Sequence, residues 1–291
     1  MEPATPLISN HTDHENNYHF LKSETNNTIL QLEVLKSFSL EIGTKIKIDQ
    51  FGLTEGSLRN MKDGITYFGY NGVNNDNNIN NNNISDNKEK EENSLDYLLP
   101  IKRCDNPGRF FKIQYIKKLN EFILKHLQKG FGTFIKVNDS MYLRNKSIIN
   151  LGDVYLAIFF CEKKEKEKEN NVKDIYGFNC DLKIKVYNSN NKEYFFEKNN
   201  DKVIKIGRIN YGNDIELNDN LISKINCTIR YNNIKGWMIK DGSDFILKSG
   251  EIMRKYSKNG TWILINDNIK ITENMIFKSN FNIFKCNFIR E

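Results

Sequence analysis

The sequence predicts an all-β protein made of two tandem antiparallel β-sandwiches. Short segments of alternating apolar and polar residues occur along most of the chain, and Gly, Asn, Asp and Ser separate them. Alternation with period two is typical of a strand that buries one face, and frequent turn signals are typical of a sandwich. A set of these segments occurs twice in the same order, which favours two copies of one unit. One short stretch, residues 29–38, has a helical alternative.

Length and charge limit the classes of function. The 291 residues, of which 38% are hydrophobic, are enough for about two domains. The net charge of +6 comes from 43 basic and 37 acidic residues. This mild excess suits a surface that meets phosphorylated or acidic partners, and it suits plain solubility equally well. It does not favour nucleic acid as a partner, because the lysines are scattered among acids; such binding would show a steep salt dependence.

The cysteines and histidines form no metal or disulfide pattern. The five cysteines are odd in number and widely spaced, and three of the four histidines lie in the polar N-terminal stretch. We therefore expect reduced thiols buried in strands, no metal and no cofactor, in an intracellular protein of the nucleus or the cytoplasm. No apolar run approaches the roughly 18 residues of a membrane span, and no signal peptide is evident, so no membrane partner is expected.

The first half is expected to form a divergent sandwich over residues 28–161. Residues 1–27 are polar and predicted to be disordered. Strand patterns cover residues 44–48 and 65–69. Residues 71–93 then form an Asn-rich run that cannot bury enough apolar surface to fold, so we expect a surface loop insertion within this domain.

A mixed-charge run, residues 162–177, is expected to link this domain to a second one, residues 178–291. Trp237 and Trp262 lie in apolar strand patterns of the second domain and are expected in its core. The main alternating segments there are residues 182–186, 203–206, 227–231 and 284–288.

The internal repeat relates the two predicted domains. The matched segments are residues 113–115 with 229–231, 122–124 with 237–239, and 132–137 with 260–265. The intervals differ because the second copy carries an insertion between Gly242 and Ser257. Two copies of one small all-β unit are the simplest explanation.

Loop residues of the second half combine groups that can bind a phosphate. Gly207 and Arg208 end one strand, Ser223 and Lys224 lie in a later loop, and Asn259 precedes a glycine. Together with the run NDIELND, these segments resemble the forkhead-associated (FHA) domain family, whose pattern is Gly-Arg, Asn-Asp-Ile, Ser-Arg-x-His and Asn-Gly-Thr. The resemblance covers residues 178–290 and implies a β-sandwich that binds phosphothreonine peptides. Each segment alone would be an ordinary turn.

The resemblance also implies a role for each residue. Arg208 would offer two parallel N–H groups to the phosphate, Ser223 a hydroxyl, and Lys224 a point charge. Asn259 would bind the peptide backbone. The supporting loop residues are Gly207, Asn226, Gly260 and Thr261. Asn226 stands where the family has histidine, and Lys224 stands where it has arginine, which loses the two-pronged geometry.

The first half resembles the family only in its scaffold. Tyr70 stands where the arginine belongs, residues 107–110 replace the Ser-Arg-x-His segment, and Phe131 replaces the asparagine of Asn-Gly-Thr. Arg59 and Arg109 are the cations expected near a remodelled site, and an ordinary structural role for both is the alternative. A tandem arrangement with a divergent first copy is similar to FHA proteins of protists.

We expect a non-catalytic signalling protein whose second domain binds a phosphothreonine-containing protein. No Ser-His-Asp set, P-loop or kinase motif set competes with this interpretation. The alternative is a structural protein–protein interaction scaffold that keeps the fold without binding phosphate.

Overall fold

The computed structural model describes residues 28–71, 94–99, 107–162, 180–187, 191–199 and 201–290. The described residues form strands and turns without an α-helix, so the predicted all-β class is confirmed. Residues 29–38, for which a helix was the alternative, lie mostly in a strand. The predicted disordered N-terminus, nearly all of the Asn-rich insertion and nearly all of the predicted linker lie outside the described residues.

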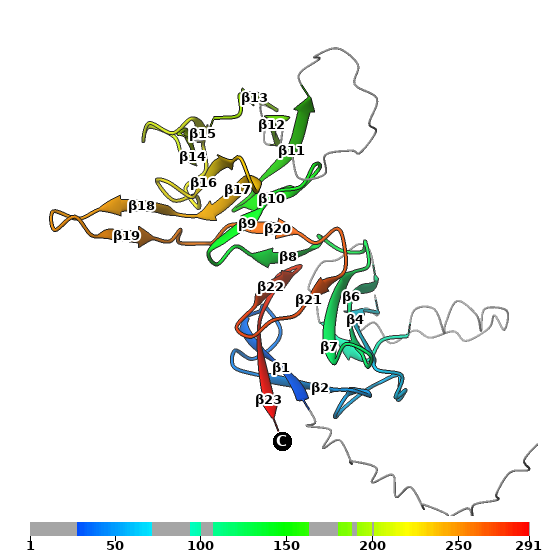
Figure 1. Cartoon of the computed structure of the whole chain (residues 1–291). Coiled ribbons are helices and arrows are strands. Elements are labelled where there is room, and N and C mark those ends of the chain that lie inside the picture. The colour runs from blue at the N-terminus through cyan, green and yellow to red at the C-terminus, as the bar shows by residue number, and fades with distance from the viewer. Residues whose placement is uncertain are drawn as a thin grey trace, which may run out of the picture.

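The first sandwich consists of a six-stranded portion of a large sheet and a facing five-stranded sheet (Figure 1). The strands of the six-stranded portion, in spatial order, are β3 (Gly52–Leu53), β2 (Lys45–Asp49), β1 (Thr28–Lys36), β23 (Asn282–Arg290), β22 (Ile276–Ser279) and β8 (Thr133–Lys136). The facing sheet contains β21 (Ile269–Lys270), β7 (Glu121–His126), β6 (Gly108–Ile116), β4 (Ile65–Tyr70) and β5 (Tyr97–Leu98).

The second sandwich has the same arrangement. One sheet contains β13 (Glu193–Phe196), β12 (Cys180–Tyr187), β11 (Val154–Glu162), β10 (Ile148–Leu151) and β20 (Trp262–Leu264). The facing sheet contains β15 (Ile215–Leu217), β14 (Val203–Arg208), β16 (Cys227–Asn232), β17 (Gly236–Asp241) and β9 (Ser140–Tyr142). The insertion of the second copy is a separate hairpin of β18 (Ser243–Ile246) and β19 (Ile252–Lys255), which projects from this sandwich (Figure 1).

The chain crosses between the sandwiches twice, and each sandwich is completed by strands from the other half of the sequence. After β8 the chain enters the second sandwich as β9, β10 and β11, and β11 pairs with β12. After β20 it returns to the first sandwich as β21, β22 and β23, and β23 pairs with β1. This pairing differs from the expectation of consecutive domains at residues 28–161 and 178–291: the first sandwich combines β1 to β8 with β21 to β23, and the second is formed by the consecutive strands β9 to β20. Periodicity locates strands but does not specify their partners.

Strands β8 and β20 are matched in the predicted repeat and pair with each other antiparallel. Ile135 lies opposite Ile263. Two equivalent hydrogen bonds flank this pair, from the backbone N–H of Val137 to Thr261 O and from that of Ile265 to Thr133 O, each 2.9 Å long. A local pseudo-twofold axis therefore passes between Ile135 and Ile263, and the pairing joins both sandwiches through one eleven-stranded sheet.

Aromatic side chains hold the facing sheets together. In the first sandwich Phe111 stacks on Phe68 at 4.5 Å between ring centroids and meets Phe277 edge-on at 5.3 Å. In the second, Trp237 is 1% exposed and its indole N–H donates to Cys180 O at 2.9 Å. Trp262 is also buried, as predicted for both tryptophans. Fully burying one such side chain contributes about 1.5–3 kcal/mol.

Candidate functional site

Gly207 places the end of β14 directly against the loop that carries Ser223 and Lys224. A Cβ at Gly207 would lie 2.2 Å from Lys224 O, so a residue with a side chain does not fit without movement of the backbone. The backbone N–H of Arg208 donates to Ser223 O at 3.0 Å. The Asn213 side chain then donates to Arg208 O at 3.0 Å and to Lys224 O at 2.8 Å, which fixes the strand end and the loop together.

The guanidinium of Arg208 is available for a ligand. Its Nε is buried and has no hydrogen-bond partner in the protein. The ring centroid of Tyr211 lies 5.3 Å from the guanidinium carbon, and the Lys224 ammonium lies 4.8 Å from the same centroid. Among the ion pairs found within the described residues, none involves Arg208 or Lys224. Tyr211 thus holds two cations near one another without neutralising either.

Ser223 is held so that its hydroxyl proton remains available. The backbone N–H of Lys258 donates to Ser223 Oγ at 2.9 Å. A hydroxyl that accepts this bond still has its own proton to donate. Ser223 therefore presents a donor in the loop that also holds Lys224.

Asn259 joins the loop before β20 to the loop after β15. Its Nδ2 donates to Leu221 O at 2.8 Å, and its backbone carbonyl accepts from the indole of Trp262 at 2.8 Å. The side chain is exposed. Its amide oxygen and second N–H remain for a ligand, which is the pairing capacity that an extended peptide backbone requires.

A buried polar network supports both loops. Asn226 is 1% exposed; its Oδ1 accepts from the Ser223 N–H at 3.2 Å, and its Nδ2 donates to Thr261 Oγ1 at 3.3 Å. Thr261 donates to the buried carboxylate of Asp241 at 2.7 Å, and Ser257 donates to the same oxygen at 2.6 Å. Asn226 thus connects the loop of Ser223 to the loop of Asn259 and Thr261. Gly260, at φ +78, allows the turn within the second of these loops.

Asp241 and Ser257 also belong to this network, which the sequence pattern does not indicate. Asp241 ends β17, where a lone carboxylate beside Gly242 looks like a turn residue. Its burial at 0% exposure, rather than its sequence context, identifies it as a structural acceptor.

Three of the four predicted phosphopeptide-binding residues, Arg208, Ser223 and Lys224, line one pocket of about 500 Å³. Asn259 does not line this pocket and lies instead in a neighbouring one that shares Leu221 and Lys258 with it. Two further cations, Lys255 and Lys258, line it as well, and no carboxylate does. Lys255 reaches the pocket from the projecting hairpin, so the insertion adds a wall that the sequence analysis did not anticipate.

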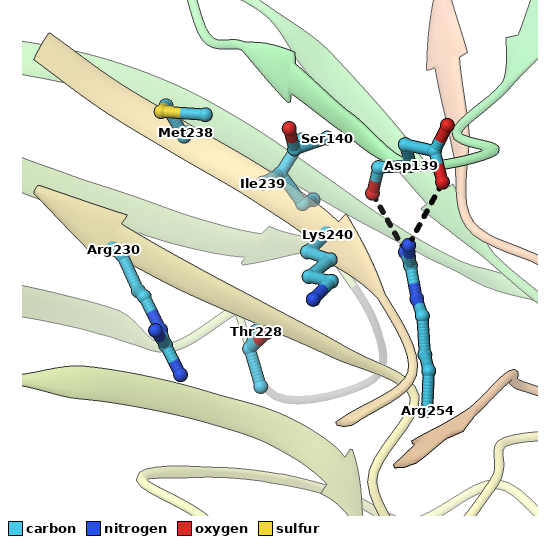
Figure 2. Close-up of a pocket in the computed structure, with 8 residues that line it drawn as sticks. All are labelled: Asp139, Ser140, Thr228, Arg230, Met238, Ile239, Lys240 and Arg254. Carbon is cyan, nitrogen blue, oxygen red and sulfur yellow. Dashed lines mark hydrogen bonds and ion pairs between the residues drawn. The ribbon is translucent and has the colours of Figure 1, made fainter. Parts of the chain in front are cut away.

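A second pocket, lined by residues of β16 and β17, has three cations, of which Lys240 and Arg254 are paired with carboxylates and Arg230 is not among the ion pairs found within the described residues. Figure 2 shows Arg254 held between the backbone and the carboxylate of Asp139, at 2.6 and 3.2 Å. Lys240 forms an ion pair with Asp244 at 2.6 Å. This pocket, of about 350 Å³, offers less uncompensated positive charge to an anion than the Arg208 pocket does.

The corresponding end of the first sandwich keeps the backbone geometry. A Cβ at Gly69 would lie 2.1 Å from Gly108 O, which matches the approach of Gly207 to Lys224. Gly69 pairs in parallel with β5 as Gly207 pairs with β15. When the two sandwiches are aligned by these strand pairings, five residues of the first correspond to site residues of the second. They are Tyr70 for Arg208, Pro107 for Ser223, Gly108 for Lys224, Phe110 for Asn226 and Phe131 for Asn259.

The two arginines considered for a remodelled first site are used internally. Arg59 forms ion pairs with Asp63 at 2.8 Å and with Asp96 at 3.1 Å, and its side chain is 8% exposed. The Arg109 guanidinium lies 3.8 Å from the ring centroid of Tyr67, and its Nε donates to Ser94 O at 2.9 Å. Both arginines therefore have the structural role that the sequence analysis kept as the alternative.

Three of the four described cysteines are buried, and Cys161 is partly buried. Cys180, Cys227 and Cys286 are buried in strands, as predicted, and burial raises the pKa of the Cys227 and Cys286 thiols. Within the described ranges, no cluster of His, Cys, Asp and Glu could hold a metal ion. No helix in that part of the chain has the length and apolar character needed to cross a membrane.

Part of the chain matches a known protein family. Residues 204–283 match the FHA domain family, whose members are phosphopeptide-binding modules rather than enzymes. The matched segment includes β14 to β20 of the second sandwich and also β21 and β22, which complete the first. No curated protein and no solved structure matches the chain.

Proposed function

We propose that the protein is a non-catalytic reader of phosphothreonine in signalling, and that it binds its partner through the pocket around Arg208. The observation that carries the proposal is the composition of this pocket: four cations and the Ser223 hydroxyl line it without a carboxylate. Phosphothreonine carries a charge of about −1.5 to −2 near neutral pH and offers three acceptor oxygens. A pocket of uncompensated donors suits that group better than it suits a neutral side chain.

Each side chain has a distinct part in the proposed complex. Arg208, whose Nε has no partner in the protein, donates two N–H groups to phosphate oxygens. Ser223 donates its hydroxyl proton while its oxygen accepts from Lys258. Lys224 adds a point charge rather than a second fork. Asn259 binds the backbone beside the phosphothreonine and keeps the peptide extended.

We further infer that the first sandwich is a divergent copy of the same unit that lacks a phosphate-binding site. Tyr70, Pro107 and Phe131 stand at the positions of Arg208, Ser223 and Asn259 and supply no cation. Its own arginines are held by Asp63, Asp96 and Tyr67. In this proposal one molecule of the protein binds one phosphothreonine.

Titration with matched peptide pools tests the proposal. The full chain is titrated with degenerate peptides that carry a fixed phosphothreonine or a fixed threonine, and binding is followed by fluorescence polarisation. We expect the phosphothreonine pool to bind at least about tenfold tighter, because a desolvated phosphate gains several charge-assisted bonds. Equal affinity for both pools would leave the alternative, a scaffold that keeps the fold without binding phosphate.

A further inference from the structure

A groove continues from the phosphate pocket toward the first sandwich. It has a volume of about 550 Å³ and shares Leu221 and Lys258 with the phosphate pocket. Asn259 also lines it. A peptide that places its phosphate beside Arg208 and its backbone beside Asn259 therefore enters this groove with its next residues.

The walls of this groove come from both sandwiches and exist because the strands are exchanged. Lys36 ends β1 and Lys278 lies in β22, both in the first sandwich, whereas Trp262 lies in β20 of the second. Lys136, from β8, reaches the loop of Asn259 directly: its Cε lies 3.1 Å from the position that a Cβ on Gly260 would take.

The groove carries a surplus of positive charge. Lys36, Lys136, Lys258 and Lys278 line it, and its one carboxylate belongs to Asp153. None of these lysines takes part in an ion pair found within the described residues. An anionic side chain that enters the groove therefore meets several unpaired cations close to the phosphate pocket.

Lys278 is the most strongly desolvated of these cations. Its ammonium lies 4.8 Å from the Trp262 ring centroid and 5.1 Å from that of Phe134, and it donates to Asn150 Oδ1. Burial, followed by the nearby charge of Lys36, lowers the pKa of Lys278 to about 8. A partly buried ammonium without a counter-ion has lost part of its hydration energy, and an incoming anion compensates for that loss.

We propose that this groove selects anionic side chains, carboxylates or a second phosphoresidue, that flank the phosphothreonine in the same peptide. The inference rests on the proposed function and deepens it. The first sandwich, which has no phosphate-binding site of its own in this proposal, makes the site of the second sandwich selective for the residues beside the phosphothreonine. The occupant is the same phosphopeptide, because the groove and the phosphate pocket share residues and the charges are complementary.

The test compares phosphothreonine peptides whose flanking positions on both sides are Glu, Gln or phosphoserine. The full chain is used as wild type and as Lys36→Gln, Lys36→Gln/Lys278→Gln and Lys118→Gln. Lys118 is the control because it lies in the exposed turn between β6 and β7, outside the groove. We expect wild type and the control to bind the Glu peptide roughly tenfold tighter than the Gln peptide, a preference that several partly exposed ion pairs together supply.

The variants separate the possible outcomes. Lys36→Gln, at an exposed position, should reduce the preference for Glu, and the double variant should reduce it to about twofold. Both should leave the affinity for the Gln peptide unchanged. A higher affinity for phosphoserine than for Glu would identify a second phosphate as the preferred anion. Equal affinity of wild type for Glu and Gln peptides, with dependence on phosphothreonine retained, would overturn the groove alone. Loss of that dependence would overturn the proposed function and the groove with it.

Discussion

Ile135 of β8 lies directly opposite Ile263 of β20, and these two isoleucines are matched in the internal repeat that the sequence predicts. Because equivalent strands pair antiparallel, each copy of the unit faces the other across a local twofold axis. Beyond this pair the chain exchanges its last strands: β9 to β11 complete the second sandwich and β21 to β23 complete the first. The two sandwiches are therefore one structural unit. The groove beside Asn259 exists because residues of both sandwiches line it.

Cleavage between the halves should not separate them. A protease site inserted within residues 163–179 would cut the chain between β11 and β12, which remain paired over eight residue positions, Tyr155↔Tyr187 through Glu162↔Cys180. We expect the two fragments to elute together in size-exclusion chromatography, because β23 also stays paired with β1. Fragments that separate under native conditions would contradict the strand exchange.

The FHA-like half alone should not fold. A fragment of residues 178–291 lacks β9, β10 and β11, so β12, β17 and β20 would each lose a neighbouring strand. Buried apolar residues such as Leu182 and Ile239 would become exposed. We expect a poorly dispersed amide NMR spectrum for this fragment. A well-dispersed spectrum would show that the exchanged strands are dispensable.

Gly207→Ala and Gly69→Ala form a matched pair. Each added methyl would meet a backbone oxygen, 2.2 Å away at Gly207 and 2.1 Å away at Gly69. We expect each substitution to lower the free energy of unfolding by about 1–3 kcal/mol, measured by urea denaturation. Only Gly207→Ala should also weaken phosphopeptide binding by folded protein, since it displaces the Lys224 loop. Equal effects of both substitutions on binding would indicate a purely global change.

Asn226→Ala should loosen the loops that present Ser223 and Asn259. The substitution leaves the Ser223 N–H without its acceptor and removes one partner of Thr261. Losing buried hydrogen bonds of this kind lowers stability by about 1–3 kcal/mol. Thermal and urea unfolding would measure the change, with Asn218→Ala, at an exposed position, as the control. An Asn226→Ala variant as stable as the control would mean that the network does not support the loops.

The charge of Lys278 predicts a pH-dependent stability difference. The folded-state pKa is lowered from 10.5 to about 8, by burial and then by Lys36. Between these values the unfolded chain binds the extra proton and the folded chain does not, so this group makes stability rise with pH. Lys278→Met should therefore be more stable than wild type at pH 7, and its advantage should shrink by pH 10. A difference in unfolding free energy that is constant across this range would contradict the lowered pKa.

Local patterns were sufficient to predict the all-β class. They were also sufficient to select Arg208, Ser223 and Lys224, which line one pocket. They were sufficient because alternation and turn residues act over a few positions, and the site lies on loops that directly follow strands. Local patterns could not show which copy each later strand joins. Strands β11 and β23 are both nine residues long and rich in apolar residues, so either could fit either sheet by pattern alone.

Two parts of the site depend on contacts between distant segments. Asp241 becomes a buried acceptor only when Ser257 and Thr261 fold over it. Lys278 joins the groove only because β22 crosses to lie beside β8. Neither position carries a local signal, since a lone Asp at a turn and a Lys in an alternating strand are common on protein surfaces.

The affinity of Arg208→Ala for a phosphothreonine peptide tests the central claim most directly. Arg230→Ala serves as the control, because Arg230 is an exposed arginine of the same sandwich outside the phosphate pocket. Removal of a charged partner from a desolvated pair typically costs about 2–5 kcal/mol, or roughly 30-fold to several thousand-fold in affinity. Isothermal titration calorimetry should show a loss of this size for Arg208→Ala, with unchanged thermal stability, and wild-type affinity for Arg230→Ala. An Arg208→Ala variant that binds the phosphopeptide as tightly as wild type would contradict the assignment of this site.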